Sequence, residues 1–185
     1  MISKNRAIEL LNEHLGNENL KKHCFASAAI MKAMANHFQQ PAEEWEITGL
    51  LHDLDYDNTR ETPEKHALET IDMLKNEDFP EEYLQAIGSH NEENGMVRKS
   101  MLDHALAASE SITGLIVACA LIYPDKKISS VKPKSIKKRM KEKAFARTVS
   151  RENIKECENA GINLDEFIVL SLKAMAEIEN ELMSN

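Results

Sequence analysis

The sequence predicts an all-α protein, a single-domain helical bundle of about seven to nine helices. Aromatic residues make up only 5% of the chain, Gly and Pro are few, and most of the abundant residues cost little in a helix. Apolar side chains recur every three or four positions, which is the period of a helix face. Cap and stop residues divide the 185 residues into segments of helical length.

The chain begins with two expected helices. Ser3 suits the N-cap of a helix over residues 4–15, and Gly16 and Asn17 end it. A longer helix is expected over residues 18–38, because its apolar stripe keeps the helical period and its small residues allow close packing.

A third helix is expected to open at Pro41, because proline and the acids after it suit a first helical turn. It should end near His52 and Asp53. Residues 54–60 break the apolar period and are expected to form a loop. Thr62 and Pro63 together resemble an N-cap and a first helical position, so a fourth helix should begin there, with His66 in its first turns.

The fifth and sixth helices follow the same rules. Pro80 and two acids open a helix that should end at His90, and the polar residues 91–95 form a loop. Residues 100–122 are the most apolar segment, and Pro124 stops that helix.

The C-terminal part holds a basic segment and two more helices. Residues 126–143 carry nine Lys or Arg against the single acid Glu142, a local charge of +8 in a chain whose net charge is −8. Ser150 is an expected N-cap, Gly161 a helix stop, and residues 164–182 a closing amphipathic helix.

The composition also argues against several classes of protein, among them disulfide-rich, membrane-spanning and secreted proteins. The three cysteines, Cys24, Cys119 and Cys157, are far apart and odd in number, which argues against a disulfide framework or a cysteine zinc site and favours a cytoplasmic protein. No stretch is expected to reach the roughly 20 apolar residues that span a bilayer, and no signal peptide is visible. The acidity outside the basic segment makes nucleic acid an unfavoured partner.

Histidines at helix ends and on helix faces form the pattern that indicates chemistry. His23 lies on the apolar stripe of the second expected helix, His52 and Asp53 end the third, His66 begins the fourth and His90 ends the fifth. Helical bundles build metal sites in this way, from side chains that project inward off facing helices.

A single acid follows on the next helix. Glu110 shares a face with Leu106, Thr113 and Val117, so it is expected on a buried side. An unpaired buried carboxylate costs several kcal/mol, roughly, or becomes neutral, and a metal cation would remove that cost.

These residues, taken in order, resemble the HD-domain metal-dependent phosphohydrolases. The family has a His, an adjacent His-Asp pair, two further His in its dinuclear members and a late Asp. This chain offers His23, His52–Asp53, His66, His90 and, within residues 108–114, Glu110 in place of the Asp. It looks closest to the small stand-alone prokaryotic proteins of HD or HDIG type, and the likeness covers most of the chain. The Lys that follows the pair in some cyclic-dinucleotide phosphodiesterases is absent, which argues against that activity.

The expected ligands are mainly imidazoles, which bind Mn, Fe, Co, Ni or Zn in preference to Mg. The site is therefore expected to hold one or two such divalent ions. Asp53 could bridge two ions. The remaining expected ligands divide into His23, His52 and Glu110 on one side, and His66 and His90 on the other. Water activated by such ions becomes a nucleophile near neutral pH.

The expected function is therefore a metal-dependent phosphohydrolase or phosphodiesterase acting on a small phosphorylated substrate, with a nucleotide as one candidate. The expected catalytic residues are His52, Asp53 and Asp57. Residues of the basic segment could fold over the metal site and hold phosphate, or could form only a solvated helix face. The candidates for that substrate contact are Lys132, Lys134, Lys137, Lys138 and Arg139.

Four other polar residues are weaker candidates for a role in the site. Asp55 could assist a ligand or transfer protons, Asp103 shares the face of Glu110, and Arg98 and Lys99 could contact substrate. The remaining histidines are expected to be hydrogen-bonded core residues. They are His14, His37 and His104.

Two other functions stay open. One is a catalytically weak protein of the same fold that binds a nucleotide or RNA through residues 126–143, and the other is a dinuclear iron oxygenase. A homodimer is also compatible with the sequence.

Overall fold

The computed structural model describes residues 1–184, and every regular element in that range is helical. The elements below include three 3-10 turns, η1 (Pro63–Lys65), η2 (Glu92–Asn94) and η3 (Ile128–Ser130). The α-helices are α1 (Lys4–His14), α2 (Glu18–Phe38), α3 (Ala42–Leu51), α4 (Tyr56–Thr59), α5 (Leu68–Leu74), α6 (Glu81–His90), α7 (Met101–Leu121), α8 (Pro133–Met140), α9 (Arg151–Ala160), α10 (Leu164–Glu177) and α11 (Glu179–Leu182). The predicted all-α class is confirmed, but the described residues form eleven α-helices rather than seven to nine, because the single turns α4 and α11 are additional to the expected helices.

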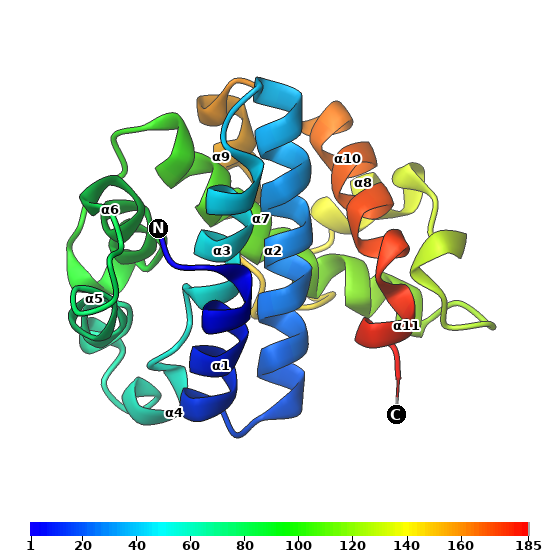
Figure 1. Cartoon of the computed structure of the whole chain (residues 1–185). Coiled ribbons are helices and arrows are strands. Elements are labelled where there is room, and N and C mark those ends of the chain that lie inside the picture. Colours follow the sequence, from blue (N-terminus) through cyan, green and yellow to red (C-terminus); the bar gives the residue numbers. More distant parts are fainter. Residues whose placement is uncertain (185) are drawn as a thin grey trace.

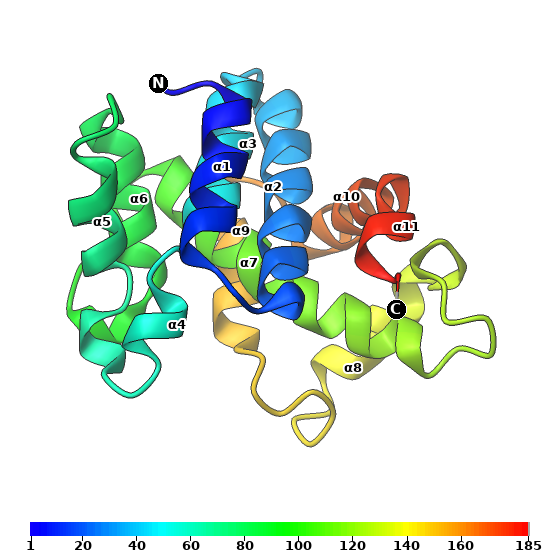
Figure 2. The same ribbon diagram turned by 60° about the horizontal axis from the view of Figure 1, so that its bottom comes forward.

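The two longest helices, α2 and α7, form the centre of the bundle (Figure 1). The first of them packs against α3, α7 and α10, and α1 covers α3. The pair α5 and α6 lies on one side of the molecule, and α8, α10 and α11 lie on the other, as Figure 2 also shows. Helix α9 packs along α7. This arrangement brings the C-terminal ends of α3 and α6 toward the middle of α7.

The predicted N-caps Ser3 and Ser150 both make a capping hydrogen bond. The Ser3 hydroxyl accepts a hydrogen bond from the amide of Arg6, and the Ser150 hydroxyl accepts one from Asn153. Gly161 ends α9 with a φ of 103°, a left-handed conformation that favours glycine. These local bonds satisfy backbone groups that a helix end leaves free.

Three expected boundaries were wrong. The expected loop at residues 54–60 contains the single turn α4. The helix expected from Pro63 is only the 3-10 turn η1, and α5 begins at Leu68, so His66 lies between the two rather than in a helix. The closing segment divides at Ile178 into α10 and α11.

Helix α7 corrects the expectation that no segment could span a bilayer. By length and composition alone, Met101–Leu121 is long and apolar enough to cross a membrane. However, 67% of its tested window is buried inside the bundle, as in the core helix of a globular protein. Its apolar character therefore has a structural explanation.

The three cysteines are free and buried, one each in α2, α7 and α9. The three histidines that were expected to be hydrogen-bonded core residues differ in burial and in hydrogen bonding. His104 bonds to the carboxylate of Glu156, with 2.5 Å between Nδ1 and Oε2, and His14 is half-buried. His37 is exposed, so its assignment to the core was wrong.

Candidate metal centre

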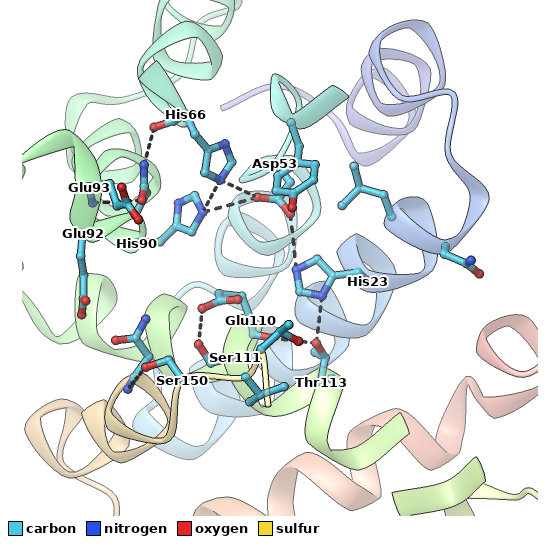
Figure 3. A pocket seen from close by; sticks show the side chains of 18 of the residues that line it. His23, Asp53, His66, His90, Glu92, Glu93, Glu110, Ser111, Thr113 and Ser150 are labelled. Carbon is cyan, nitrogen blue, oxygen red and sulfur yellow. Dashed lines mark hydrogen bonds and ion pairs between the residues drawn. The ribbon is translucent and has the colours of Figure 1, made fainter. Parts of the chain in front are cut away.

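Six side chains from separate parts of the bundle meet beside one pocket, and Figure 3 labels all of them except His52. Helix α2 supplies the first of them from its second turn, and the C-terminal ends of α3 and α6 supply three more. The turn before α5 and the middle of α7 supply the last two. The six residues are His23, His52, Asp53, His66, His90 and Glu110.

The carboxylate of Asp53 lies at the centre of the four imidazoles. Its Oδ1 is 3.2 Å from Nε2 of His66 and 3.4 Å from Nε2 of both His52 and His90. Its Oδ2 is 3.5 Å from Nε2 of His23. Only 5% of Asp53 is exposed, so this carboxylate meets the imidazoles in a largely dry setting.

The imidazoles form two pairs. The Nε2 atoms of His23 and His52 are 3.2 Å apart, and those of His66 and His90 are also 3.2 Å apart. A carboxylate oxygen of Glu110 lies within 4.8 Å of the nitrogens of the first pair. The cluster thus has two groups of candidate ligands, His23, His52 and Glu110 on one side and His66 and His90 on the other, with Asp53 between them.

Hydrogen bonds at the opposite ring nitrogens fix how each imidazole is turned. Nδ1 of His52 donates to the carbonyl of Gly49 at 2.9 Å, and Nδ1 of His90 donates to the carbonyl of Ile87 at 2.5 Å. Both acceptors lie three residues earlier in the same helix. With its proton on Nδ1, a neutral imidazole presents the lone pair of Nε2 to the centre.

The other two imidazoles use side-chain partners. Nδ1 of His66 donates to Oδ1 of Asp55 at 2.7 Å, which is the carboxylate–histidine arrangement that orients metal ligands. Nδ1 of His23 donates to the hydroxyl of Thr113 at 2.9 Å, and that hydroxyl donates to the carbonyl of Glu110.

This donor set fits a metal ion. Four Nε2 atoms and the carboxylates of Asp53 and Glu110 converge there, and the hydroxyl of Ser111 donates a hydrogen bond to Oε1 of Glu110. Two nitrogen lone pairs held this close repel one another, and either a proton on one of the two nitrogens or a metal cation between them removes the repulsion. Imidazole and carboxylate ligands in this proportion suit Mn, Fe, Co, Ni or Zn.

Burial and nearby charges shift the pKa values of His52, Asp53, His66 and Glu110. Burial lowers the pKa of His52 to about 3, although the Asp53 carboxylate opposes this. Burial also lowers the pKa of His66, but bonds to Asp53 and Asp55 outweigh it and raise that pKa to about 10. The pKa of Asp53 is held well below its usual range by the surrounding imidazoles despite burial, whereas burial raises the pKa of Glu110.

A network of asparagines holds His66 in its non-helical position. The next residue, Ala67, has a φ of 72°, which is strained for a residue with a Cβ. The side-chain amides of Asn91 and Asn94 both donate to the carbonyl of His66, and Asn94 also donates to the carbonyl of Gly88 in α6. The turn that carries His66 is thereby tied to the helix that carries His90.

Arg98 forms hydrogen bonds with the C-terminal end of α6, the helix that carries His90. Its guanidinium donates to the carbonyls of Ser89 and His90 at 3.1 and 3.0 Å, and to the carboxylate of Glu92 at 3.1 Å. These bonds satisfy carbonyls at the C-terminal end of α6 that the helix leaves free. Arg98 therefore supports His90 rather than lining the pocket, where a substrate contact was expected.

The pocket that opens over the cluster has a volume of about 610 Å³. Its walls come from the first turns of α2 and α9, from η2, and from Tyr56. The pocket residues besides the candidate ligands include Asn17, Asn19, Asn91, Glu92, Glu93, Ser111, Thr148, Ser150 and Asn153.

Asp57 does not join the cluster. It is exposed, and its carboxylate accepts a hydrogen bond from the amide of Gly16 at 2.9 Å, so it joins α4 to the turn between α1 and α2. Asp55, two residues earlier, is fully buried and contacts His66 directly. Of the two acids, the structure thus places Asp55, and not Asp57, next to an expected ligand.

The basic segment does not fold over the pocket. Lys137 pairs with Asp165 at 2.6 Å, and Lys138 and Arg139 pair with Glu142. Lys132 and Lys134 are exposed, and none of the five lines the pocket. Asp103 forms a capping box with Ser100 at the start of α7, and Lys99 is exposed beside it.

Sequence reasoning missed Thr113 as the partner of His23, and it missed the asparagine network. Thr113 was visible on the face of Glu110, but Asn91 and Asn94 gave no signal in a polar loop. A model of the HD domain family matches residues 20–120, a span that contains all six clustered residues. No curated protein and no solved structure matches the chain.

Proposed function

The chain belongs to the HD domain family, and from that premise we propose that it is a metal-dependent phosphohydrolase acting on a small phosphorylated substrate. The family commonly consists of metal-dependent hydrolases, and the cluster offers a matching ligand set. The observation that carries the proposal is the convergence of four Nε2 atoms on the carboxylate of Asp53.

Each part of the site has a definite task. His23, His52 and Glu110 would hold an ion at one end of Asp53, and His66 and His90 would hold one at the other. The residues would hold a divalent ion whose chemistry would be to lower the pKa of water toward neutrality, which would provide a nucleophile, and to attract phosphate.

The protein's own contribution is to hold these groups still. The Nδ1 bonds prevent the rings from turning, and Asp55 keeps His66 oriented through a carboxylate contact of 2.7 Å. Fixed ligands need no reorganisation when charge develops on the phosphorus oxygens.

Metal analysis of the purified chain tests the proposal. After reconstitution with Mn, Fe, Co, Ni or Zn, mass spectrometry should count one or two ions per chain. Asp53→Ala and His52→Ala should lose metal and release of phosphate from p-nitrophenyl phosphate, whereas the exposed Asp72→Ala should keep both. An unaltered metal content in Asp53→Ala would remove the basis of the proposal.

A binding function is the second candidate, because exposed lysines of the basic segment lie outside the pocket. It predicts salt-sensitive binding of a nucleotide or RNA that survives loss of Asp53. Oxygen uptake without phosphate release would instead indicate an oxygenase. Cytoplasmic location and a homodimer stay predictions from the sequence.

A further inference from the structure

The wall of the metal pocket carries no positive side chain. None of its lining residues within the described chain is a lysine or an arginine, and apart from the candidate ligands its charged members are the acids Glu92 and Glu93. Sites that bind several phosphate groups normally add Arg or Lys to their metal ions. The pocket therefore lacks partners for phosphates beyond the first.

Two arginines near the wall, Arg98 and Arg151, are not among the lining residues, and protein groups already occupy their donors. Arg98 donates to the carbonyls of Ser89 and His90, and behind the wall it also donates to the side chains of the wall residues Glu92 and Asn153. Arg151 follows the wall residue Ser150, but its guanidinium donates to the carbonyls of the preceding loop.

Two lysines that follow wall residues in α2 are also engaged. Near the first turn of α2, Lys21 pairs with Glu18 at 3.1 Å and Lys22 donates to the carbonyl of Ser184 at 2.5 Å. To reach a substrate, each of these cations would have to give up bonds that it already makes.

Neutral polar groups occupy the wall instead. Asn17, Asn19 and Asn153 present amides, Thr148 and Ser150 present hydroxyls, and all come from the first turns of α2 and α9 or from just before them. Such groups exchange hydrogen bonds with hydroxyl and carbonyl groups of an uncharged ligand. A volume of about 610 Å³ accommodates a small molecule of that kind.

The net charge of the metal centre also matches a single phosphate group. With two divalent ions bound, two carboxylates and four neutral imidazoles would give the centre a charge of about +2. A phosphate monoester carries roughly −1.5 to −2 at pH 7, which matches that charge, whereas each added phosphate exceeds it.

We propose that the substrate is a phosphate monoester with one phosphate group and an uncharged, hydroxyl-bearing body, and that the neutral and acidic wall disfavours oligophosphates. This rests on the proposed function, since it names the substrate class of the same site. In the reaction, water forms a new bond to phosphorus, the ester P–O bond breaks, and the leaving alcohol takes up a proton.

The inference is tested with substrates that share one nucleoside and differ only in the number of phosphate groups. For AMP, ADP and ATP, the metal-loaded chain should show kcat/KM at least about tenfold higher for AMP. Calorimetric binding of the three nucleotides to the same protein gives a second readout, and AMP should bind tightest. ATP that is hydrolysed or bound as well as AMP overturns the proposal.

Adding a cation to the wall should reverse the preference. Thr148→Lys and Asn19→Lys should each raise the ATP-to-AMP ratio of kcat/KM about tenfold, by supplying the missing phosphate partner. Asn36→Lys, in the separate groove between α2 and α10, adds the same charge and should leave the ratio unchanged. An equal rise in all three variants would show long-range attraction and contradict the inference.

The two proposals fail differently. If neither p-nitrophenyl phosphate nor any of the three nucleotides is hydrolysed by the metal-loaded chain, the phosphohydrolase proposal fails, but selective binding of AMP would still support the ligand class. If phosphate is released from ATP as readily as from AMP, the function stands and the substrate inference falls. Arg147→Ala completes the set, because this exposed arginine lies next to Thr148 and its loss should not change the ratio.

Discussion

At the scale of single residues, the cluster depends on what each imidazole does with its outer nitrogen. The sequence allowed six candidate ligands to be named, because each falls at a helix end or on an apolar helix face. It could not show that Asp55 and Thr113 hold His66 and His23, since those bonds join residues 11 and 90 positions apart. Asp57 was preferred over Asp55 in the prediction because turn position alone does not reveal which carboxylate is buried.

The protonation of His66 gives a pH prediction. In the metal-free protein its pKa is raised to about 10, so the ring carries a proton on both nitrogens at neutral pH. A metal ion can bind Nε2 only after that proton leaves, so binding should release a proton and affinity should rise with pH. Calorimetry in two buffers that differ in ionisation heat measures the release.

Asp55→Asn provides the matched variant for this experiment. It removes one of the two carboxylates that raise the pKa of His66, so fewer protons should be released at neutral pH. A metal affinity that stays constant between about pH 6 and pH 9 would contradict the assignment of His66 as a ligand.

At the scale of elements, caps determined what the sequence could reveal. The predicted bounds of α2 were correct because Asn17 accepts hydrogen bonds from the first amides and Gln39 ends the helix in a left-handed conformation. The start of α5 was missed because Ala67 takes a positive φ, which no alanine signals in advance. That conformation is stabilised by contacts with η2, and so it depends on the fold.

Arg98 should control one end of the metal centre. Arg98→Met removes the bonds to the carbonyls of Ser89 and His90, so the His66–His90 end should bind its ion about 10- to 100-fold more weakly. The other end should keep its ion, and metal titration should therefore change from two equivalents toward one.

Arg6→Met serves as the control for Arg98→Met. Arg6 also makes several charged contacts, with Glu9, Glu13 and Glu77, but it does so on α1, away from the pocket. Two ions bound with unchanged affinity in Arg98→Met would show that the carbonyl bonds do not position His90.

The crossing of α2 and α3 should not tolerate a larger residue at Gly49. A Cβ there would lie 2.9 Å from Cγ of Met31 and 3.0 Å from the backbone of Ala28, which cannot move aside. Overpacking of about 1–3 kcal/mol should exceed the gain in helix propensity, which is about 1 kcal/mol. Thermal unfolding of Gly49→Ala should show a Tm lower by several degrees.

Gly16→Ala is the comparison for the crossing. Its Cβ would meet only Asp57 Oδ2, at 3.8 Å, which is an ordinary contact. If both variants melt at the wild-type temperature, the close approach of α2 and α3 has no energetic cost.

At the scale of the whole molecule, charge is divided between regions. The segment 126–143 carries +8, yet the metal pocket has no lysine or arginine among its described lining residues. The sequence revealed the basic segment but could not place it, because its position depends on how α8 packs against α7 and α10. A segment that follows the ligands along the chain can lie far from them in the fold.

Charge reversal on α8 should leave catalysis unchanged. Lys134→Glu with Lys138→Glu changes two exposed residues outside the pocket, so kcat/KM for a phosphate monoester should stay within about twofold at physiological salt, where the Debye length is about 8 Å. Steady-state kinetics check this. A tenfold loss would restore the interpretation in which these lysines hold substrate phosphate.

The three buried cysteines give the protein built-in reporters of local opening. Burial raises the pKa of all three thiols, and Cys24, Cys119 and Cys157 have no exposed surface. A thiol reagent can reach each one only when α2, α7 or α9 separates from its neighbours. Labelling rates in the native state would therefore rank the opening free energies of the three helices, and a metal ion that joins α2 to α7 should slow labelling of Cys24 and Cys119 more than that of Cys157.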